Sequence, residues 1–340
     1  MSLFAILAAA VAAAPTSLWP IQNLVSFGDS YTDEARARYF FDHNGQAPPI
    51  GQLIPPSNNT ASGGYAWGRF VANETGATYY DYAVSGAMCS QNIVPRQFFG
   101  RPFPDVLEYE VPTYEKEVLF PGLYPNRFPW NTVYTLWVGT NDLGTNGFLG
   151  DRQRPGFTLD SYMECIWSVF DRIYASGGRQ FVLFNQAPLE EAPMYATPSK
   201  YGRGNTRYWE NPSAYNTTEF AEKIREYTTA VNSLFAYGVP YNLIVKQRWK
   251  GATFSVFDVH SLMVDMIDNP GEYFDVPADV KAPFRNCLNG CTTSPNPPSS
   301  FFWFDELHPS ERTSSIVASN FIDVVRRQSK YGTTWDSYWG

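Results

Sequence analysis

Short apolar runs alternate with longer amphipathic stretches along this chain. The apolar runs are rich in β-branched and aromatic residues, which is typical of strands buried on both faces of a parallel sheet. The five runs are NLVSFGD at 23–29, TYYDYAV at 78–84, TVYTLWVG at 132–139, RQFVLFNQ at 179–186 and TFSVFDV at 253–259. We expect each run to form a strand.

Three amphipathic stretches carry apolar residues at spacings of three and four, the period of a helix with one buried face. They lie at 160–178, 217–238 and 309–328; the first two stop at glycine and the third opens with proline. Strands that alternate with helices predict the α/β class, with a doubly wound sheet and helices on both faces.

Long stretches dense in Pro, Gly, Asn and aromatic residues separate these elements at 42–66, 95–130 and 186–215. We interpret them as loops laid over the core, where substrate sites are commonly shaped. Because the chain shows no internal repeat and no break in composition, a single domain is the economical interpretation.

Composition and charge narrow the class of partner. The 340 residues are 44% hydrophobic and 17% charged, as in an ordinary globular protein. The net charge is −8 and no run of Lys or Arg occurs, which argues against nucleic acid or an anionic membrane surface as the main partner. A neutral small-molecule or oligosaccharide substrate suits this balance, and we expect a monomer.

The chain opens with an apolar stretch, Leu3 to Ala13, followed by small residues, which is typical of a secretory signal peptide. We assign residues 1–17 to the signal and 18–340 to the domain. About a dozen apolar residues are too few to span a bilayer, and no later segment offers the roughly 20 that a spanning helix needs. We therefore expect a secreted, extracellular protein without a stable membrane anchor.

Three tripeptides match the glycosylation sequon, at Asn58, Asn73 and Asn216. They agree with export, although such tripeptides also arise by chance in a chain of this length.

The four cysteines, Cys89, Cys165, Cys287 and Cys291, can pair in three ways in an oxidising compartment. We favour Cys287 with Cys291, because the Gly among the intervening residues lets a small loop turn and no further ligands for zinc lie nearby. Cys89 and Cys165 either pair or stay buried as thiols.

In FGDS, an apolar strand runs into Gly28, Asp29 and Ser30. Ligands of open α/β sheets bind outside the carboxyl ends of the strands, which is where this serine falls. The alternative is that Asp29 and Ser30 only cap the following helix, since both residue types are preferred there.

Serine catalysis needs a base, and the chain offers only His43, His260 and His308. In WFDELHPS, Asp305 precedes His308 by three residues. A turn of that length can place the carboxylate on the near ring nitrogen while the far nitrogen points outward, as a Ser-His-Asp triad requires. The alternative is a loop histidine with a capping aspartate. We interpret His260 as a buried or capping residue and assign no function to His43.

Two further strand ends carry hydrogen-bond donors. In WVGTND, the side-chain amide of Asn141 follows a strand, and in DYAVSGAM the backbone N–H of Gly86 does so. A tetrahedral oxyanion needs two or three such preorganised donors, and the backbone N–H of Ser30 would be a third. The alternatives are an ordinary turn asparagine and turn glycine.

Together these blocks resemble the GDSL or SGNH hydrolase superfamily, because FGDS, the glycine of AVSGA, GTND and DxxH occur in that family's order between residues 25 and 310. The resemblance implies a three-layer α/β/α, flavodoxin-like fold with a parallel central sheet. It implies Ser30 as nucleophile, His308 and Asp305 as the rest of the triad, and Gly86 and Asn141 as oxyanion donors. The Tyr of GDSY, where the family name has Leu, is at a non-catalytic position.

The expected activity is two-step acyl transfer by a serine esterase that needs no metal or cofactor. The extended motif FGDSYTDE, with the signal, the sequons and a pI near 5.0, resembles fungal secreted acetylesterases of carbohydrate esterase family sixteen. That resemblance implies deacetylation of xylo- or other hemicellulose oligosaccharides. The alternatives are a lipolytic GDSL enzyme, such as a lysophospholipase, lipase or acyltransferase, and an inactive carbohydrate-binding protein of the same fold.

Overall fold

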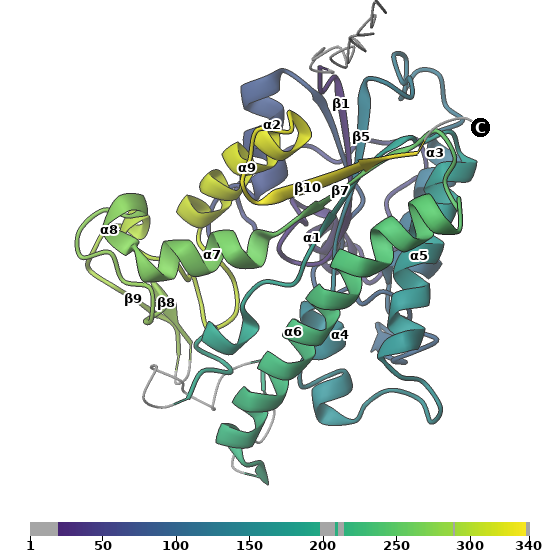
Figure 1. Cartoon of the computed structure of the whole chain (residues 1–340). Helices are drawn as coiled ribbons and strands as arrows, with labels where there is room; N and C mark the ends of the chain where they lie inside the picture. Colours follow the sequence, from purple (N-terminus) through teal and green to yellow (C-terminus); the bar gives the residue numbers. More distant parts are fainter. Residues whose placement is uncertain (1–19, 198–207, 210–213, 288–289, 338–340) are drawn as a thin grey trace, which may run out of the picture.

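A six-stranded sheet forms the centre of the computed structural model, which describes residues 20–197, 208–209, 214–287 and 290–337 (Figure 1). Its strand order is β10-β7-β6-β5-β1-β2. The strands are β1 Asn23–Gly28, β2 Thr78–Asp81, β5 Thr132–Trp137, β6 Gln180–Phe184, β7 Thr253–Phe257 and β10 Gly332–Asp336. The first five are parallel and coincide with the five predicted runs, while β10 pairs antiparallel with β7.

The sequence did not indicate β10. Its residues GTTWD mix polar and aromatic side chains at the edge of the sheet, where burial on both faces is not required. By contrast, every residue of β1 and of β5 is buried, which explains the continuous apolar character that identified them.

Helices cover both faces of this sheet, so the predicted three-layer α/β/α arrangement is confirmed. In Figure 1, α2 (Trp67–Thr75), α7 (Val259–Asp268) and α9 (Glu311–Val325) lie on one side, and α3 (Val111–Glu117), α5 (Leu159–Ala175) and α6 (Thr217–Pro240) on the other. The shorter elements are α1 Arg36–Asp42, α4 Thr140–Leu143, α8 Pro270–Tyr273, β3 Gln97–Phe98, β4 Arg101–Pro102, β8 Arg285–Asn286 and β9 Thr292–Thr293.

The expected loop at 95–130 was only partly correct, because it contains the hairpin of β3 and β4 and a π-helical turn, Val106–Glu110, that runs into α3. These elements are short and flanked by Pro and Gly, so no helical period stands out in the sequence. Buried Val106, Val111 and Tyr114 nevertheless anchor the segment to the core.

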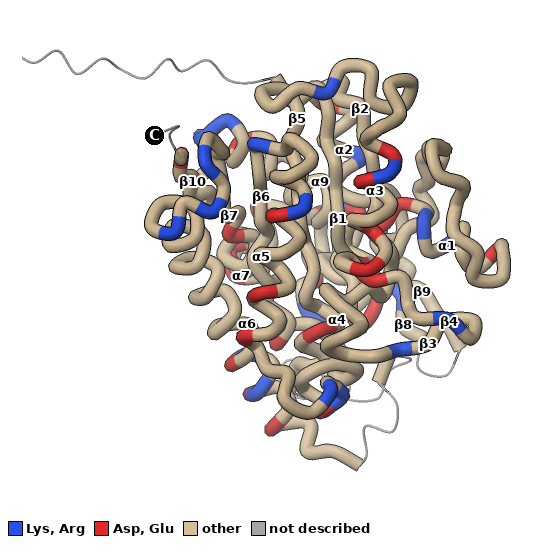
Figure 2. Tube along the Cα trace, turned by 90° about the vertical axis from the view of Figure 1, so that its right-hand side faces the viewer, with Lys and Arg blue, Asp and Glu red and all other residues tan. Residues whose placement is uncertain are grey.

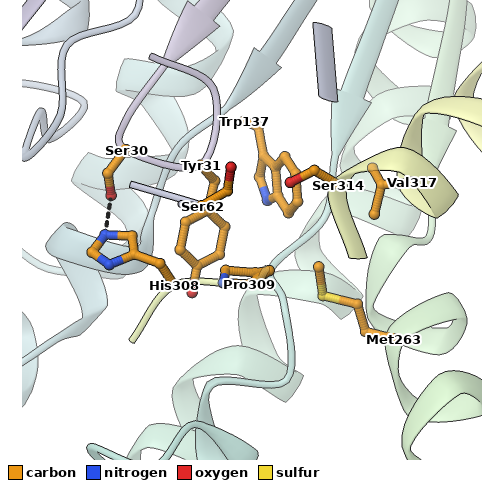
Figure 3. Close-up of a pocket in the computed structure, with 9 residues that line it drawn as sticks. All are labelled: Ser30, Tyr31, Ser62, Trp137, Met263, His308, Pro309, Ser314 and Val317. Carbon is orange, nitrogen blue, oxygen red and sulfur yellow. Dashed lines mark hydrogen bonds between the residues drawn. The ribbon is translucent and has the colours of Figure 1, made fainter. Parts of the chain in front are cut away.

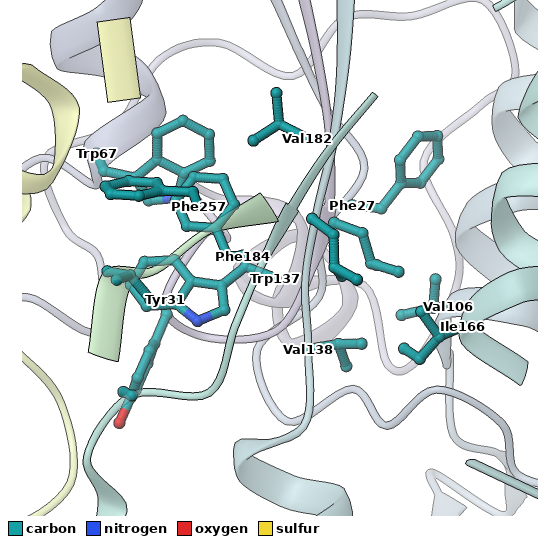
Figure 4. Close-up of a cluster of buried hydrophobic side chains, with 14 of the residues drawn as sticks. Phe27, Tyr31, Trp67, Val106, Trp137, Val138, Ile166, Val182, Phe184 and Phe257 are labelled. Carbon is teal, nitrogen blue, oxygen red and sulfur yellow. The ribbon is translucent and has the colours of Figure 1, made fainter. Parts of the chain in front are cut away.

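Buried aromatic side chains fill the layer between the sheet and α2, as Figure 4 shows for Trp67, Trp137, Phe184 and Phe257. The rings of Trp137 and Phe184 stack with their centroids 4.9 Å apart. Tyr31 adds an edge-on contact to Trp137 at 5.2 Å, so this core extends to the residue that follows Ser30.

Two disulfides join the cysteines. The preferred pair, Cys287–Cys291, is present, and Cys89–Cys165 ties the segment after β2 to α5, which answers the question that the sequence left open. The sequon residues Asn58, Asn73 and Asn216 are all exposed. The predicted signal, residues 1–17, lies outside the described residues, and among the helices that are described none has the length and apolarity to cross a bilayer.

Candidate active site

Ser30 lies just beyond the carboxyl end of β1, at a place where two strands approach closely. Gly28 has a φ of 146°, and a Cβ there would overlap the carbonyl oxygen of Trp137 on β5. Only glycine fits such a position. The N–H of Asp29 donates to the same oxygen at 3.3 Å, so the turn that carries Ser30 is fixed to the neighbouring strand.

Ser30, His308 and Asp305 form a hydrogen-bonded chain. The Nε2 atom of His308 is 2.8 Å from the Oγ of Ser30, as the dashed line in Figure 3 marks, and its Nδ1 is 2.9 Å from the Oδ1 of Asp305. All three side chains are buried, with Ser30 8% and His308 6% exposed. This order of contacts is the one that lets an imidazole accept the serine proton while a carboxylate fixes its tautomer.

The carboxylate of Asp305 is fully engaged. Its Oδ1 also accepts the backbone N–H groups of Leu307 and His308, at 3.0 and 2.9 Å. Its Oδ2 accepts the hydroxyl of Tyr208 at 2.7 Å. Burial alone would raise the pKa of Asp305, but the charge of His308 and the hydrogen bonds from His308 and Tyr208 outweigh it and hold that pKa below its usual range. The group is therefore an anion at neutral pH.

The sequence did not indicate Tyr208 as a residue of the site. It lies 97 residues before Asp305, in a segment expected to be a loop, and no local pattern connects the two. Its ring also packs edge-on against the imidazole of His308, with centroids 5.4 Å apart.

The predicted oxyanion donors flank Ser30 on both sides. β1 lies between β2 and β5 in the sheet, so Gly86, which follows β2, and Asn141, which follows β5, reach the same edge as Ser30. The two segments are tied together, because the side-chain amide of Asn141 donates to the carbonyl oxygen of Ala87 at 2.9 Å. That bond uses one of the two N–H groups of the amide.

Phe103 and Arg96 fix the position of Gly86. Its φ of 91° favours glycine, and a Cβ added there would meet the Cζ of Phe103 at 2.9 Å. The guanidinium of Arg96 stacks 4.1 Å from the Phe103 ring and donates to the carbonyl oxygen of Gly86. Arg96 also pairs with buried Asp105, which fixes its position.

Buried carboxyl groups hold the segments that follow β1, β2 and β5 through hydrogen bonds to their backbone. Glu110 accepts the N–H groups of Gly28 and Val84, at 2.9 and 3.1 Å, and so connects the ends of β1 and β2. Asp33 accepts the N–H of Ser85 at 2.7 Å, and Asp142 accepts that of Cys89 at 2.9 Å. The sequence did not indicate this role for Glu110 or Asp33.

Burial is the largest influence on the pKa values of Glu110 and Asp142. It raises the pKa of Glu110 well above the usual value and that of Asp142 to about 7. Burial likewise raises the pKa of Asp29 to about 7, against the lowering effect of hydrogen bonds from the Tyr31, Gly139 and Thr140 backbone.

A small pocket adjoins Ser30 and His308 (Figure 3). Its further lining residues are Tyr31, Ser62, Trp137, Met263, Pro309, Ser314 and Val317. The hydroxyl of Tyr31 donates to the carbonyl oxygen of Leu307 at 2.8 Å, which joins the Ser30 segment to the His308 segment.

The other two histidines have local contacts. Exposed His43 stacks on Tyr39 with ring centroids 3.8 Å apart, and the ring of His260 lies 3.7 Å from Glu190. Within the described ranges, no group of three or more His, Cys, Asp and Glu side chains is arranged to hold a metal ion.

The three-layer α/β/α fold and this arrangement define a hydrolase of the kind that can carry out nucleophilic acyl transfer at a serine. A family model described as GDSL-like Lipase/Acylhydrolase matches residues 24–321, and the chain belongs to this family. It is a carboxylic ester hydrolase, which confirms the enzyme class expected from the sequence.

Among curated proteins, the chain is 42% identical to an acetylesterase of Hypocrea jecorina over 320 residues, which covers 93% of this chain and 92% of that protein. It is 26% identical to an acetylesterase of Thermothelomyces thermophilus, covering 88% and 87% of the two chains. The resemblance to acetylesterases within the GDSL family is thereby confirmed. A solved acetylxylan esterase of Geobacillus stearothermophilus is 13% identical, with a TM-score of 0.40 over 91% of this chain and 95% of that one.

Proposed function

We propose that this protein is a secreted acetylesterase that removes acetyl groups from hemicellulose-derived xylo-oligosaccharides, with Ser30 as nucleophile, His308 as base and Asp305 as its orienting carboxylate. The observation that carries the triad is the continuous hydrogen-bonded chain from the Oγ of Ser30 through both nitrogens of His308 to Asp305.

In the first step, Ser30 Oγ attacks the ester carbonyl carbon while its proton moves to Nε2 of His308. The negative charge then on the carbonyl oxygen is met by the backbone N–H groups of Ser30 and Gly86 and by the free N–H of Asn141. Collapse of this intermediate breaks the bond to the sugar oxygen, which takes the proton from His308. Water repeats the sequence on the acetyl-serine and releases acetate, so no metal or cofactor takes part.

The choice of acetyl is supported by the size of the pocket beside Ser30. The residues that line it leave little enclosed space beside Ser30, which suits a small acyl group better than a long one. The side chains of Trp137, Met263 and Val317 close it on the apolar side. The names of the two relatives, both acetylesterases, support the same choice.

Acyl-chain profiling tests this proposal. We expect kcat/KM to fall in the order p-nitrophenyl acetate, butyrate and octanoate. A preference for octanoate would instead establish the lipolytic alternative. Acetylated xylo-oligosaccharides, followed by release of acetate, test the sugar part of the proposal directly.

Replacement of Ser30 tests the nucleophile. Ser30→Ala should lower turnover of p-nitrophenyl acetate by at least about a thousandfold, because the covalent route is lost. Ser57→Ala, in the loop before Asn58, is the matched control and should keep wild-type turnover. A fluorophosphonate that fails to label Ser30 in the wild-type protein would favour the inactive carbohydrate-binding alternative.

The same proposal includes export after removal of residues 1–17, a single domain over 18–340, glycans on exposed Asn58, Asn73 and Asn216, and a monomer. Intact mass of the protein collected from the medium, before and after removal of N-glycans, tests the first three, and light scattering tests the last. A retained leader peptide would contradict export by this route.

A further inference from the structure

A second, larger hollow adjoins the active-site pocket. It has a volume of about 370 Å³ and is lined in part by Ser62, which also lines the pocket beside Ser30. We call it the aromatic groove and define it by Ser62, Phe70, Phe284, Phe304, Glu311 and Arg312. Since Phe304 stands four residues before His308 in the chain, the groove begins at the catalytic loop.

The floor of the aromatic groove is made of phenylalanine rings. Phe284 and Phe304 are half-buried and stack with centroids 6.2 Å apart and planes 27° apart. Phe304 lies so close to Gly63 that any side chain at position 63 would overlap its ring. Its backbone N–H donates to the carbonyl oxygen of His308 at 2.8 Å. The floor is therefore fixed both to the groove wall and to the catalytic histidine.

The rim of the aromatic groove is polar and balanced in charge. Arg312 is exposed, and its Nε is held by the carbonyl oxygen of Tyr273 at 2.8 Å. Glu311 accepts the N–H of Tyr65 at 2.8 Å through one oxygen. A rim with one cation and one anion suits a neutral ligand with many hydroxyl groups. An extended acyl chain could pack on the rings, but it could not form hydrogen bonds with these polar groups.

The groove also continues away from the active site. A second hollow between α2 and α9 shares Phe70, Arg312 and Ser315 with it and extends to Asn73 and Ser319. The groove beside the pocket therefore has room for more than a single small group.

From these observations we propose that the aromatic groove binds the sugar units next to the acetylated one, with pyranose faces on Phe284 and Phe304 and hydroxyl groups at Glu311 and Arg312. This inference rests on the proposed function and adds a binding site for the unreacted part of an oligosaccharide. It makes the enzyme selective for chain length, since remote binding energy can promote reaction at the bound ester.

The first test compares kcat/KM, by acetate release, on acetylated xylose and on acetylated xylotetraose. We expect the wild-type enzyme to favour the tetramer by roughly fivefold or more, which corresponds to about 1 kcal/mol of added contact. Equal values per acetyl group would overturn the groove and leave the esterase proposal standing. No acetate release from either sugar, with p-nitrophenyl acetate still hydrolysed, would overturn the sugar substrate and the groove together.

The second test uses the ratio of the two kcat/KM values in variants, because any general catalytic defect cancels in that ratio. Phe284→Ala should bring the ratio close to one. Ser315→Trp, on a partly exposed face of α9, should do the same by filling the groove without removing its floor. Phe128→Ala removes an exposed ring that stacks on Trp130 near the opposite ends of the strands and should keep the wild-type ratio.

An acyl occupant would give a different pattern. If Phe284→Ala and Ser315→Trp lowered kcat/KM on p-nitrophenyl octanoate but left the sugar ratio unchanged, the groove would be an acyl channel and our proposal would be wrong.

Discussion

Two sets of buried carboxyl groups serve this site, and their pKa values are shifted in opposite directions. Asp305 is 1% exposed and is an anion, because His308 and Tyr208 contact it directly. Glu110 and Asp142 are no more exposed, yet burial raises their pKa values, since backbone N–H groups are their main partners. Burial alone therefore does not decide the charge of a carboxyl group here; the partners do. Figure 2 shows acidic residues along the interior near β1 and α3, where most of the second set lies.

The comparison predicts that replacing a carboxyl group by its amide lowers activity strongly only in the first set. Asp305→Asn should lower kcat on p-nitrophenyl acetate by about 10⁴, because an amide no longer fixes the required tautomer of His308. Asp151→Asn, at an exposed position, is the matched control and should retain full activity. Activity within tenfold of wild type in Asp305→Asn would show that the carboxylate is not the orienting group.

Removal of a carboxyl from the second set should damage stability instead. Glu110→Ala leaves the buried N–H groups of Gly28 and Val84 without their carboxyl partner, at a cost of about 3 kcal/mol. Urea unfolding measures this loss. Glu74→Ala, on the exposed side of α2, should change the free energy of unfolding by less than about 0.5 kcal/mol. A Glu110→Ala protein as stable as wild type would mean that the connection between β1 and β2 is not needed.

These two residues also mark how far sequence reasoning reaches. Asp305 and His308 are three positions apart, so their relation is local and visible in the sequence. Glu110 lies 82 residues from Gly28 in a segment that Pro and Gly made look like a loop, and its function depends on the packing of α3 against the sheet. The central strands were predictable because β1 and β5 are buried over their whole length and β6 and β7 over all but one residue, whereas edge strand β10 and long-range partners such as Tyr208 depend on contacts that no local pattern encodes.

The second set also predicts how stability depends on pH. The pKa of Asp29 and that of Asp142 are about 7 in the fold, against 3.8 for an ordinary aspartate. The folded protein therefore holds more protons than the unfolded chain between about pH 4 and pH 7, and its stability decreases as pH rises through that window. We expect each of the two groups to contribute about 2 kcal/mol less stability at pH 7.5 than at pH 5.5.

Calorimetry at several pH values measures this dependence, and Asp142→Asn provides the comparison. An amide cannot titrate, so the variant should lose the contribution of Asp142, which is about 2 kcal/mol between pH 5.5 and 7.5. Asp151→Asn should keep the wild-type slope, since its carboxyl is exposed. Stability that does not change with pH over this window would show that both carboxyl groups are already ionised in the fold at pH 5.5.

The smallest expected effect concerns Tyr208, the contact that separates Asp305 from the second set. Tyr208→Phe removes the hydroxyl that donates to the Oδ2 of Asp305 and keeps the ring that packs on His308. We expect kcat/KM to fall about tenfold, because one hydrogen bond to a charged group is lost. The carboxylate then becomes more basic and stabilises protonated His308 more strongly. The acid limb of the pH profile should therefore move to higher pH.

Tyr237→Phe, at a position 78% exposed, is the control and should leave both kcat/KM and the acid limb unchanged. An unchanged kcat/KM and an unshifted acid limb would mean that the hydroxyl of Tyr208 is not needed, and that His308 alone keeps Asp305 ionised.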